Sequence, residues 1–224
     1  MMTPSSRIAA AFATALLAGL ATAGANAATV TYQTGPGLQL DIPDDSPVGV
    51  SSSIDVGDSA QIIRVGLLAL VEHTWAGDLI WTLTGPDGTE ITLADRPGGV
   101  DGGVGDSSNL SASTAIIFGD NSPVDAEEMG GGSCDSSDSI IGVDCMRWFA
   151  PDDALSTFAG TDTLGTWTLF LTDNAGLDTG FLDGWLIAFE VSEITAVPIP
   201  SAFLLMASAL VGAGALRRQT SVNA

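Results

Sequence analysis

Residues 79–93 read Leu-Ile-Trp-Thr-Leu-Thr-Gly-Pro-Asp-Gly-Thr-Glu-Ile-Thr-Leu, and this stretch decides the fold class. Apolar and polar residues alternate over 79–84 and again over 90–93, which is the period of a strand with one buried face. Between the two runs, Pro86 and Gly88 stand at the second and fourth positions of a type I turn. The stretch therefore predicts a β-hairpin.

The same pattern continues in both directions along the chain. Apolar side chains alternate over residues 63–71, and further strands are predicted at 114–118, 166–172 and 181–191. The acidic loop 173–180 joins the last two runs, and we interpret it as the loop of a second hairpin. Short strands at this spacing, without a sustained helical period, predict an all-β sandwich.

A long segment, 121–148, interrupts the strand pattern and contains both cysteines. In an exported protein, Cys134 and Cys145 are predicted to form a disulfide that closes this insert. A metal-binding or catalytic role for these thiols is disfavoured, because no histidine lies near them in the sequence.

The N-terminus, residues 1–27, has the features of a secretory signal. Arg7 precedes an apolar run at 8–20, and an Ala-x-Ala cleavage site ends at Ala27. The following residues, 28–40, are predicted to be a linker.

The C-terminal segment, 194–224, contains an apolar stretch at 201–216. A helix of that length spans about 24 Å, less than the roughly 30 Å of a bilayer core. The segment therefore predicts a transient membrane contact. Its flanking residues are Val197, Pro198 and Pro200 on one side and Arg217 and Arg218 on the other.

This layout resembles the PEP-CTERM sorting tail of bacteria that secrete exopolysaccharide. The resemblance implies processing by an exosortase-type enzyme. It also implies delivery to the cell surface or extracellular matrix of a Gram-negative bacterium, through a membrane-anchored intermediate. Ile199 stands where the commonest form of the tail has Glu, and residues 219–224 extend beyond the arginines.

The negative charge belongs to the part between these ends. All 27 acidic residues lie within 41–193, whereas three of the six arginines lie in the two ends. Residues 28–197 therefore carry a net charge of −24. This charge argues against nucleic acid and anionic lipid as partners, because both are bound through Lys and Arg. A divalent cation is the partner that such a domain attracts best, and one histidine excludes a multi-histidine metal site.

Motifs along most of the domain occur in the order found in one family. The chain resembles the P domain (P/Homo B domain) of proprotein convertases and bacterial subtilisin-like proteases. The matching segments are 42–45, 47–50, 73–79, 83–89, 93–99, 149–151, 155–160 and 165–169, with Asp173, Gly180, Leu182 and Trp185.

The resemblance implies a jelly-roll β-sandwich over 41–193, similar to galactose-binding domains. Family members follow a subtilisin-like catalytic domain, which they stabilise and whose calcium and pH responses they tune. No catalytic domain is expected here, because His73 belongs to the P-domain motif and no Gly-x-Ser-x-Gly turn accompanies it. The chain is therefore predicted not to be an enzyme.

Structural Ca²⁺ is the cofactor that the residues and the resemblance both favour. Calcium takes six to eight oxygen ligands, which acidic loops supply. The alternative is that each aspartate caps a loop backbone amide. The candidate ligands are Asp44, Asp45, Asp78, Asp173 and Asp178.

Two functions follow from these features. The first is an exported, non-catalytic surface or matrix protein that binds calcium and a glycan or matrix protein. Trp75 and Trp148 are the aromatic candidates for a carbohydrate surface because both lie in predicted loops. The second is a detached accessory domain of a subtilisin-like serine endopeptidase system.

Overall fold

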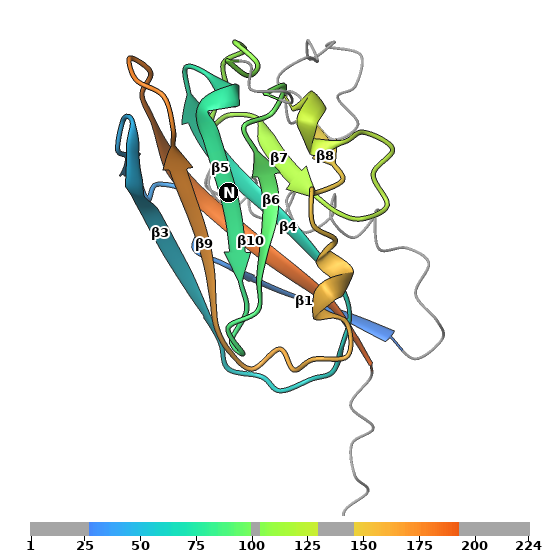
Figure 1. Cartoon of the computed structure of the whole chain (residues 1–224). Helices are drawn as coiled ribbons and strands as arrows, with labels where there is room; N and C mark the ends of the chain where they lie inside the picture. Colours follow the sequence, from blue (N-terminus) through green and yellow to red (C-terminus); the bar gives the residue numbers. More distant parts are fainter. Residues whose placement is uncertain (1–26, 100–103, 130–145, 193–224) are drawn as a thin grey trace, which may run out of the picture. The chain divides into compact units, whose positions relative to one another are not determined.

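The computed structural model describes residues 27–99, 104–129 and 146–192 (Figure 1). The chain divides into two compact units, Met1–Glu193 and Ile194–Ala224. Several predicted features lie outside the described residues: most of the signal segment, the disulfide Cys134–Cys145, and the sorting-tail residues Val197, Pro198, Pro200, Arg217 and Arg218.

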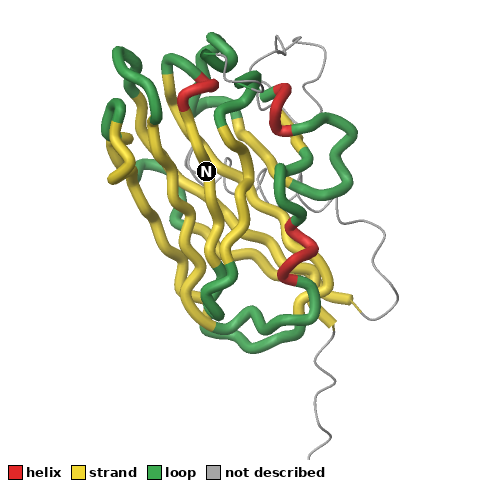
Figure 2. Tube along the Cα trace, in the orientation of Figure 1, coloured by secondary structure: helices red, strands yellow, loops and turns green. Residues whose placement is uncertain are grey.

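Two β-sheets face each other and contain nearly all the regular structure (Figures 1 and 2). The six-stranded sheet has the order β1 (Ala27–Gln33), β10 (Gly180–Ser192), β4 (Ile62–His73), β7 (Ala115–Phe118) and β8 (Met146–Phe149), with β2 (Leu40–Ile42) also paired to β10. The four-stranded sheet has the order β3 (Ser46–Val56), β9 (Gly165–Asp173), β5 (Leu79–Thr84) and β6 (Glu90–Asp95). The all-β sandwich is confirmed.

Helical structure is confined to single turns in the described part of the chain. These are the 3₁₀ helices η1 (Ala76–Asp78), η3 (Ala126–Glu128) and η5 (Leu155–Phe158). None of them has the length and apolar character that a membrane span needs.

Aromatic side chains from both sheets fill the space between them. Trp167 contacts Phe158 and Phe189 with ring centroids 4.9 and 5.0 Å apart, and Trp81 meets Phe118 at 5.7 Å. All five are fully or almost fully buried. Burying a large apolar side chain contributes about 1.5–3 kcal/mol, so these residues anchor the core.

The hairpin predicted from 79–93 is confirmed. β5 and β6 pair antiparallel from Ile80↔Asp95 to Thr84↔Glu90. The Gly88 amide donates to the Gly85 carbonyl oxygen at 3.0 Å, and Gly88 has a φ of +83°. A positive φ is accessible to glycine without strain, which explains this residue at the end of the turn.

The structure differs from the predicted alternation at the start of β4, because a β-bulge there changes which residue is buried. Val65 and the alternate residues after it face the core, but Ile62 is buried in place of Ile63. The register against β10 passes from Arg64↔Glu190 to Ile62↔Val191, which leaves Ile63 as the extra residue. A bulge of this kind reverses which face a side chain occupies.

The predicted hairpin around loop 173–180 is wrong. β9 pairs with β3 and β5 in one sheet, whereas β10 pairs with β1, β2 and β4 in the other. The loop therefore crosses between the sheets. Alternation along a strand shows which side chains are buried, but it does not identify the neighbouring strand.

The predicted linker, 28–40, is also corrected. Residues 27–33 form β1, which pairs with the end of β10 from Ala27↔Ser192 to Gln33↔Leu186. Val30 and Tyr32 pack against the core from an edge position. Residues 28–33 read Ala-Thr-Val-Thr-Tyr-Gln, which alternates apolar and polar residues as a strand does, so the linker prediction overlooked a strand pattern.

Candidate functional site

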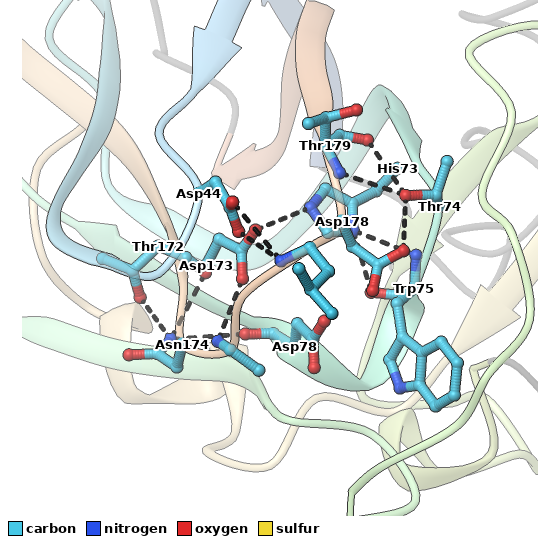
Figure 3. Close-up of polar contacts among 12 residues, drawn as sticks. Asp44, His73, Thr74, Trp75, Asp78, Thr172, Asp173, Asn174, Asp178 and Thr179 are labelled. Carbon is cyan, nitrogen blue, oxygen red and sulfur yellow. Dashed lines mark hydrogen bonds and ion pairs between the residues drawn. The ribbon is translucent and has the colours of Figure 1, made fainter.

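Loops at one end of the sandwich bring together four of the five predicted calcium ligands (Figure 3). Strand register causes this convergence, because Asp173 ends β9 opposite Leu79 and Ser46, and Gly180 begins β10 opposite His73. We call the resulting group the acidic loop cluster; it comprises Asp44, Asp78, Asp173 and Asp178. The fifth candidate, Asp45, lies beside this group, next to Gly176.

His73 and Asp173 form a fully buried pair at the base of the cluster. Nε2 of His73 lies 3.2 Å from Oδ2 of Asp173, and both side chains are completely shielded from solvent. Nδ1 of His73 lies 2.8 Å from the carbonyl oxygen of Trp75. A ring N–H at Nε2 can donate to the Asp173 carboxylate, and the Trp75 amide lies 3.2 Å from Nδ1. These contacts offset part of the cost of burying the carboxylate.

Glycine at position 180 allows this pair to sit against β10. A Cβ atom there would overlap the Glu72 carbonyl oxygen and the His73 ring. The backbone of β10 therefore approaches the imidazole more closely than any other residue permits.

Three aspartates in the cluster bind loop backbones or loop side chains. The Asp44 carboxylate accepts the Leu177 amide at 3.1 and 3.3 Å. Asp173 Oδ1 accepts the Ala175 amide at 3.1 Å, and Asp178 Oδ1 accepts the Thr74 hydroxyl at 2.7 Å. These contacts tie the three loops together, and they realise the capping role that aspartates have in turns.

Asp78 differs from these three. Its side chain is almost completely buried, and Nη2 of Arg96 lies 4.0 Å from Oδ1. Burial raises the pKa of Asp78, and the carboxylates of Asp173 and Asp178 raise it further, whereas His73 and Arg96 oppose the rise. Its ionised form is therefore disfavoured at this position.

Most of the groups in the acidic loop cluster that could bind a metal ion are oxygen atoms. Within residues 27–99, 104–129 and 146–192, no three His, Cys, Asp or Glu side chains are placed together to hold one metal ion. A calcium ion at Asp78 would therefore draw part of its shell from backbone carbonyl oxygens and water, which Ca²⁺ accepts readily.

A second acidic group, which the sequence did not indicate, lies along the free edge of β6. The Asp95 amide donates to Asp152 at 2.8 Å, and the Thr92 amide donates to Asp153 at 2.8 Å. Residue 152 as a whole is exposed, yet partial desolvation of its carboxyl group and repulsion by Glu127 raise its pKa to about 6. This segment covers an edge strand, which is a structural role.

The two tryptophans proposed for a carbohydrate surface lie on different elements. Trp75 lies beside the acidic loop cluster, where its Nε1 donates to the Val104 carbonyl oxygen at 2.9 Å. Trp148 lies on β8 and is 37% exposed. The structure does not join them into one aromatic surface.

Comparisons with known proteins give structural likenesses only. No family model matches the chain, and no curated protein matches it. The serine protease of Aeromonas sobria, solved alone and in complex with its chaperone, shares 16% identity over 79% and 80% of this chain, with TM-scores of 0.44 and 0.45. Each match takes in 29% of the solved chain. An infectious bursal disease virus structure matches 78% of this chain and 34% of its own, at 10% identity and a TM-score of 0.35.

Proposed function

We propose that this protein is an exported, non-catalytic binding module whose loop end is held rigid and strengthened by calcium. The proposal rests on the hydrogen bonds that the aspartates of the acidic loop cluster make to the loops around them. Asp44 and Asp178 each bind a neighbouring loop, and Asp173 binds Ala175 of its own loop. These hydrogen bonds between loops fix the shape of the surface that the loops form, as a binding module requires.

The contacts of His73 support a non-catalytic role. A catalytic histidine takes a proton from a nucleophilic hydroxyl or thiol, so one ring nitrogen must face that group. Here the two ring nitrogens face Asp173 and the Trp75 backbone, and the ring is fully buried. Among the described residues, no hydroxyl group is hydrogen-bonded to it.

Electrostatics at Asp78 support the calcium part of the proposal. Two neighbouring carboxylates and burial disfavour its negative charge, and the nearest guanidinium is 4.0 Å away. A bound divalent cation would remove this penalty. Asp78 and the carbonyl oxygens near it would then hold the ion, and the ion would supply structural cross-linking of the loops.

Calcium and the Asp78→Asn substitution are each expected to raise the melting temperature, because each removes the cost of the disfavoured Asp78 charge. Calcium at about 100 times its dissociation constant stabilises the folded state by about 2.7 kcal/mol, which raises the melting temperature by roughly 5–10 °C. Without metal, the variant is expected to melt higher than the unaltered protein at neutral pH, because it lacks the disfavoured charge. Differential scanning calorimetry with calcium and with chelator measures both effects.

The pH dependence without metal follows from the raised pKa of Asp78. Between the ordinary carboxyl pKa and the raised one, the folded state binds more protons, so stability falls as pH rises through this window. Asp78→Asn should flatten that fall. Asp55→Asn is the matched control. It removes the same charge near the end of β3 that is farther from the acidic loop cluster. Equal calcium shifts in all three proteins would contradict a site at Asp78.

Delivery to the cell surface or matrix is the second part of the proposal. The support is the signal segment 1–27 and the PEP-CTERM-like tail, for which an exosortase-type enzyme is the expected partner. A glycan or matrix protein is the expected ligand. Deleting residues 197–224 should release the domain into the medium, as measured by immunoblotting of cell and medium fractions. Unchanged surface delivery would show that the tail is not a sorting signal.

A second candidate function rests on the order of the P-domain motifs along 41–191. In this alternative the protein is an accessory domain that acts on a separate subtilisin-like serine endopeptidase. Co-purification with such a protease from the source cells, together with a calcium-dependent change in its activity, would favour this alternative over a matrix-binding role.

A further inference from the structure

Leu177, at the tip of the β9–β10 loop, combines two unfavourable features. Its residue surface is 97% exposed, and its backbone has a φ of +92°. A non-glycine residue in such a conformation is strained at an energetic cost, and such strain concentrates at functional sites. The exposed side chain recovers none of this cost through burial.

The surrounding loops hold Leu177 in this conformation. Its amide donates to the Asp44 carboxylate from the β2–β3 turn. On either side of it, Ala175 is bound to Asp173, and Asp178 is bound to Thr74 (Figure 3). Contacts from three loops therefore present an apolar side chain to the exterior in a defined position.

Two other exposed apolar residues belong to the same end of the sandwich. Val48 is 78% exposed and lies at the start of β3, whose first residue pairs with Asp173. Val104 is 72% exposed, and its carbonyl oxygen accepts the Trp75 indole. We call these residues the apolar rim: Val48, Val104 and Leu177. They are half of the large apolar residues exposed in the described part of the chain.

The charge near Leu177 defines the complementary partner. The Asp44 carboxylate accepts the Leu177 amide, Asp45 lies beside Gly176, and Asp178 follows Leu177 directly. We propose that the apolar rim docks a protein segment that carries leucine-like and lysine-like side chains side by side, such as an amphipathic cationic helix. Leu177 is the anchor of this contact and the aspartates pair with the basic groups. The inference rests on the proposed binding function but does not require calcium.

The test uses a labelled helical peptide of leucine and lysine as the probe, with fluorescence anisotropy as the readout. Binding is measured at about 0.15 M and 0.5 M salt, because screening removes the long-range attraction to an acidic protein. Leu177→Asn deletes the apolar side chain, and asparagine tolerates the left-handed backbone. Leu164→Asn is the matched control, because Leu164 is 50% exposed in the loop that precedes β9, at the opposite end of that strand.

At the higher salt, Leu177→Asn should weaken peptide binding at least about tenfold, whereas Leu164→Asn should change it less than twofold. The melting temperature of Leu177→Asn should be unchanged or higher, because strain is relieved. Equal binding by both variants would overturn the inference. Equal binding of a lysine–serine peptide would overturn it too, since charge alone would then suffice. Leu177-dependent binding to vesicles of zwitterionic phosphatidylcholine, without peptide binding, would overturn it as well and indicate a membrane in place of the protein partner.

This result is separable from the calcium test. A failure of calcium to stabilise the protein leaves the comparison of Leu177→Asn with Leu164→Asn intact. Conversely, calcium stabilisation with no Leu177 dependence would support the proposed function and reject the docking surface.

Discussion

Replacing Asp173 with alanine should lower the free energy of unfolding by about 2–4 kcal/mol, because it breaks hydrogen bonds and leaves a buried polar ring without its partner. The carboxylate faces the buried His73 ring at 3.2 Å and also accepts the Ala175 amide. Its removal leaves the ring nitrogen without an acceptor in a site closed to water. Since domains are stable by only about 5–15 kcal/mol, this change removes a large part of the total. Urea denaturation followed by tryptophan fluorescence measures it.

The control for this substitution is Asp44→Ala. Asp44 also accepts a backbone amide, but it is exposed, so its loss should cost only about 1 kcal/mol. A double variant with His73→Phe and Asp173→Leu should be more stable than the sum of the two single effects predicts, because neither partner is then left unpaired. Additive losses would show that the two residues do not stabilise each other.

Gly77→Ala should destabilise the protein by about 2–4 kcal/mol through a backbone collision and lost hydrogen bonds. A Cβ atom at Gly77 would overlap the backbone of Gly105 and Asp106. The hydrogen bond from the Gly77 amide to the Asp106 carbonyl oxygen, 2.9 Å long, would then break. Because backbone atoms form the obstacle, no side-chain rotation relieves the collision. Thermal unfolding should show a fall of roughly 5–15 °C.

Gly57→Ala is the matched control for this effect. A Cβ atom at Gly57 has open space around it, and its φ is compatible with an L-residue. Alanine there restricts the unfolded chain and should leave stability unchanged or raise it by up to about 1 kcal/mol. Similar losses at both positions would mean that the close approach of Gly77 to Gly105 is not what makes alanine unfavourable.

Local patterns predicted strands well and strand partners poorly. The strand at 79–84 was predicted with its observed bounds, and the turn from Gly85 to Gly88 followed from the chemistry of proline and glycine. The partners of β9 and β10 were not predictable from burial, because β9 alternates and β10 is buried on both faces over most of its length, and neither pattern identifies a neighbouring strand. β1 was missed although its apolar residues, Ala28, Val30 and Tyr32, alternate with polar ones, because the segment was assigned to a linker before the first motif.

The candidate site was predicted in composition and not in geometry. Asp44, Asp78, Asp173 and Asp178 come from segments up to about 130 residues apart, and the motif order suggested that they belong together. The role of each aspartate depends on the group that its carboxylate binds. Strand register determines which groups come close enough, and the sequence does not show that register. The strained φ of Leu177 had no signal in the sequence, since leucine is not a residue that marks a left-handed turn.

The position of β10 between β1 and β4 sets the order of events during folding. The first described strand finds its partner only about 150 residues later, as the contact between Thr34 and Trp185 illustrates. Closing so long a loop is slow, whereas the β5–β6 hairpin forms from neighbouring residues. The six-stranded sheet therefore completes only after residues 180–192 have left the ribosome. Until that moment β1 and β4 lack the strand that joins them in the sheet.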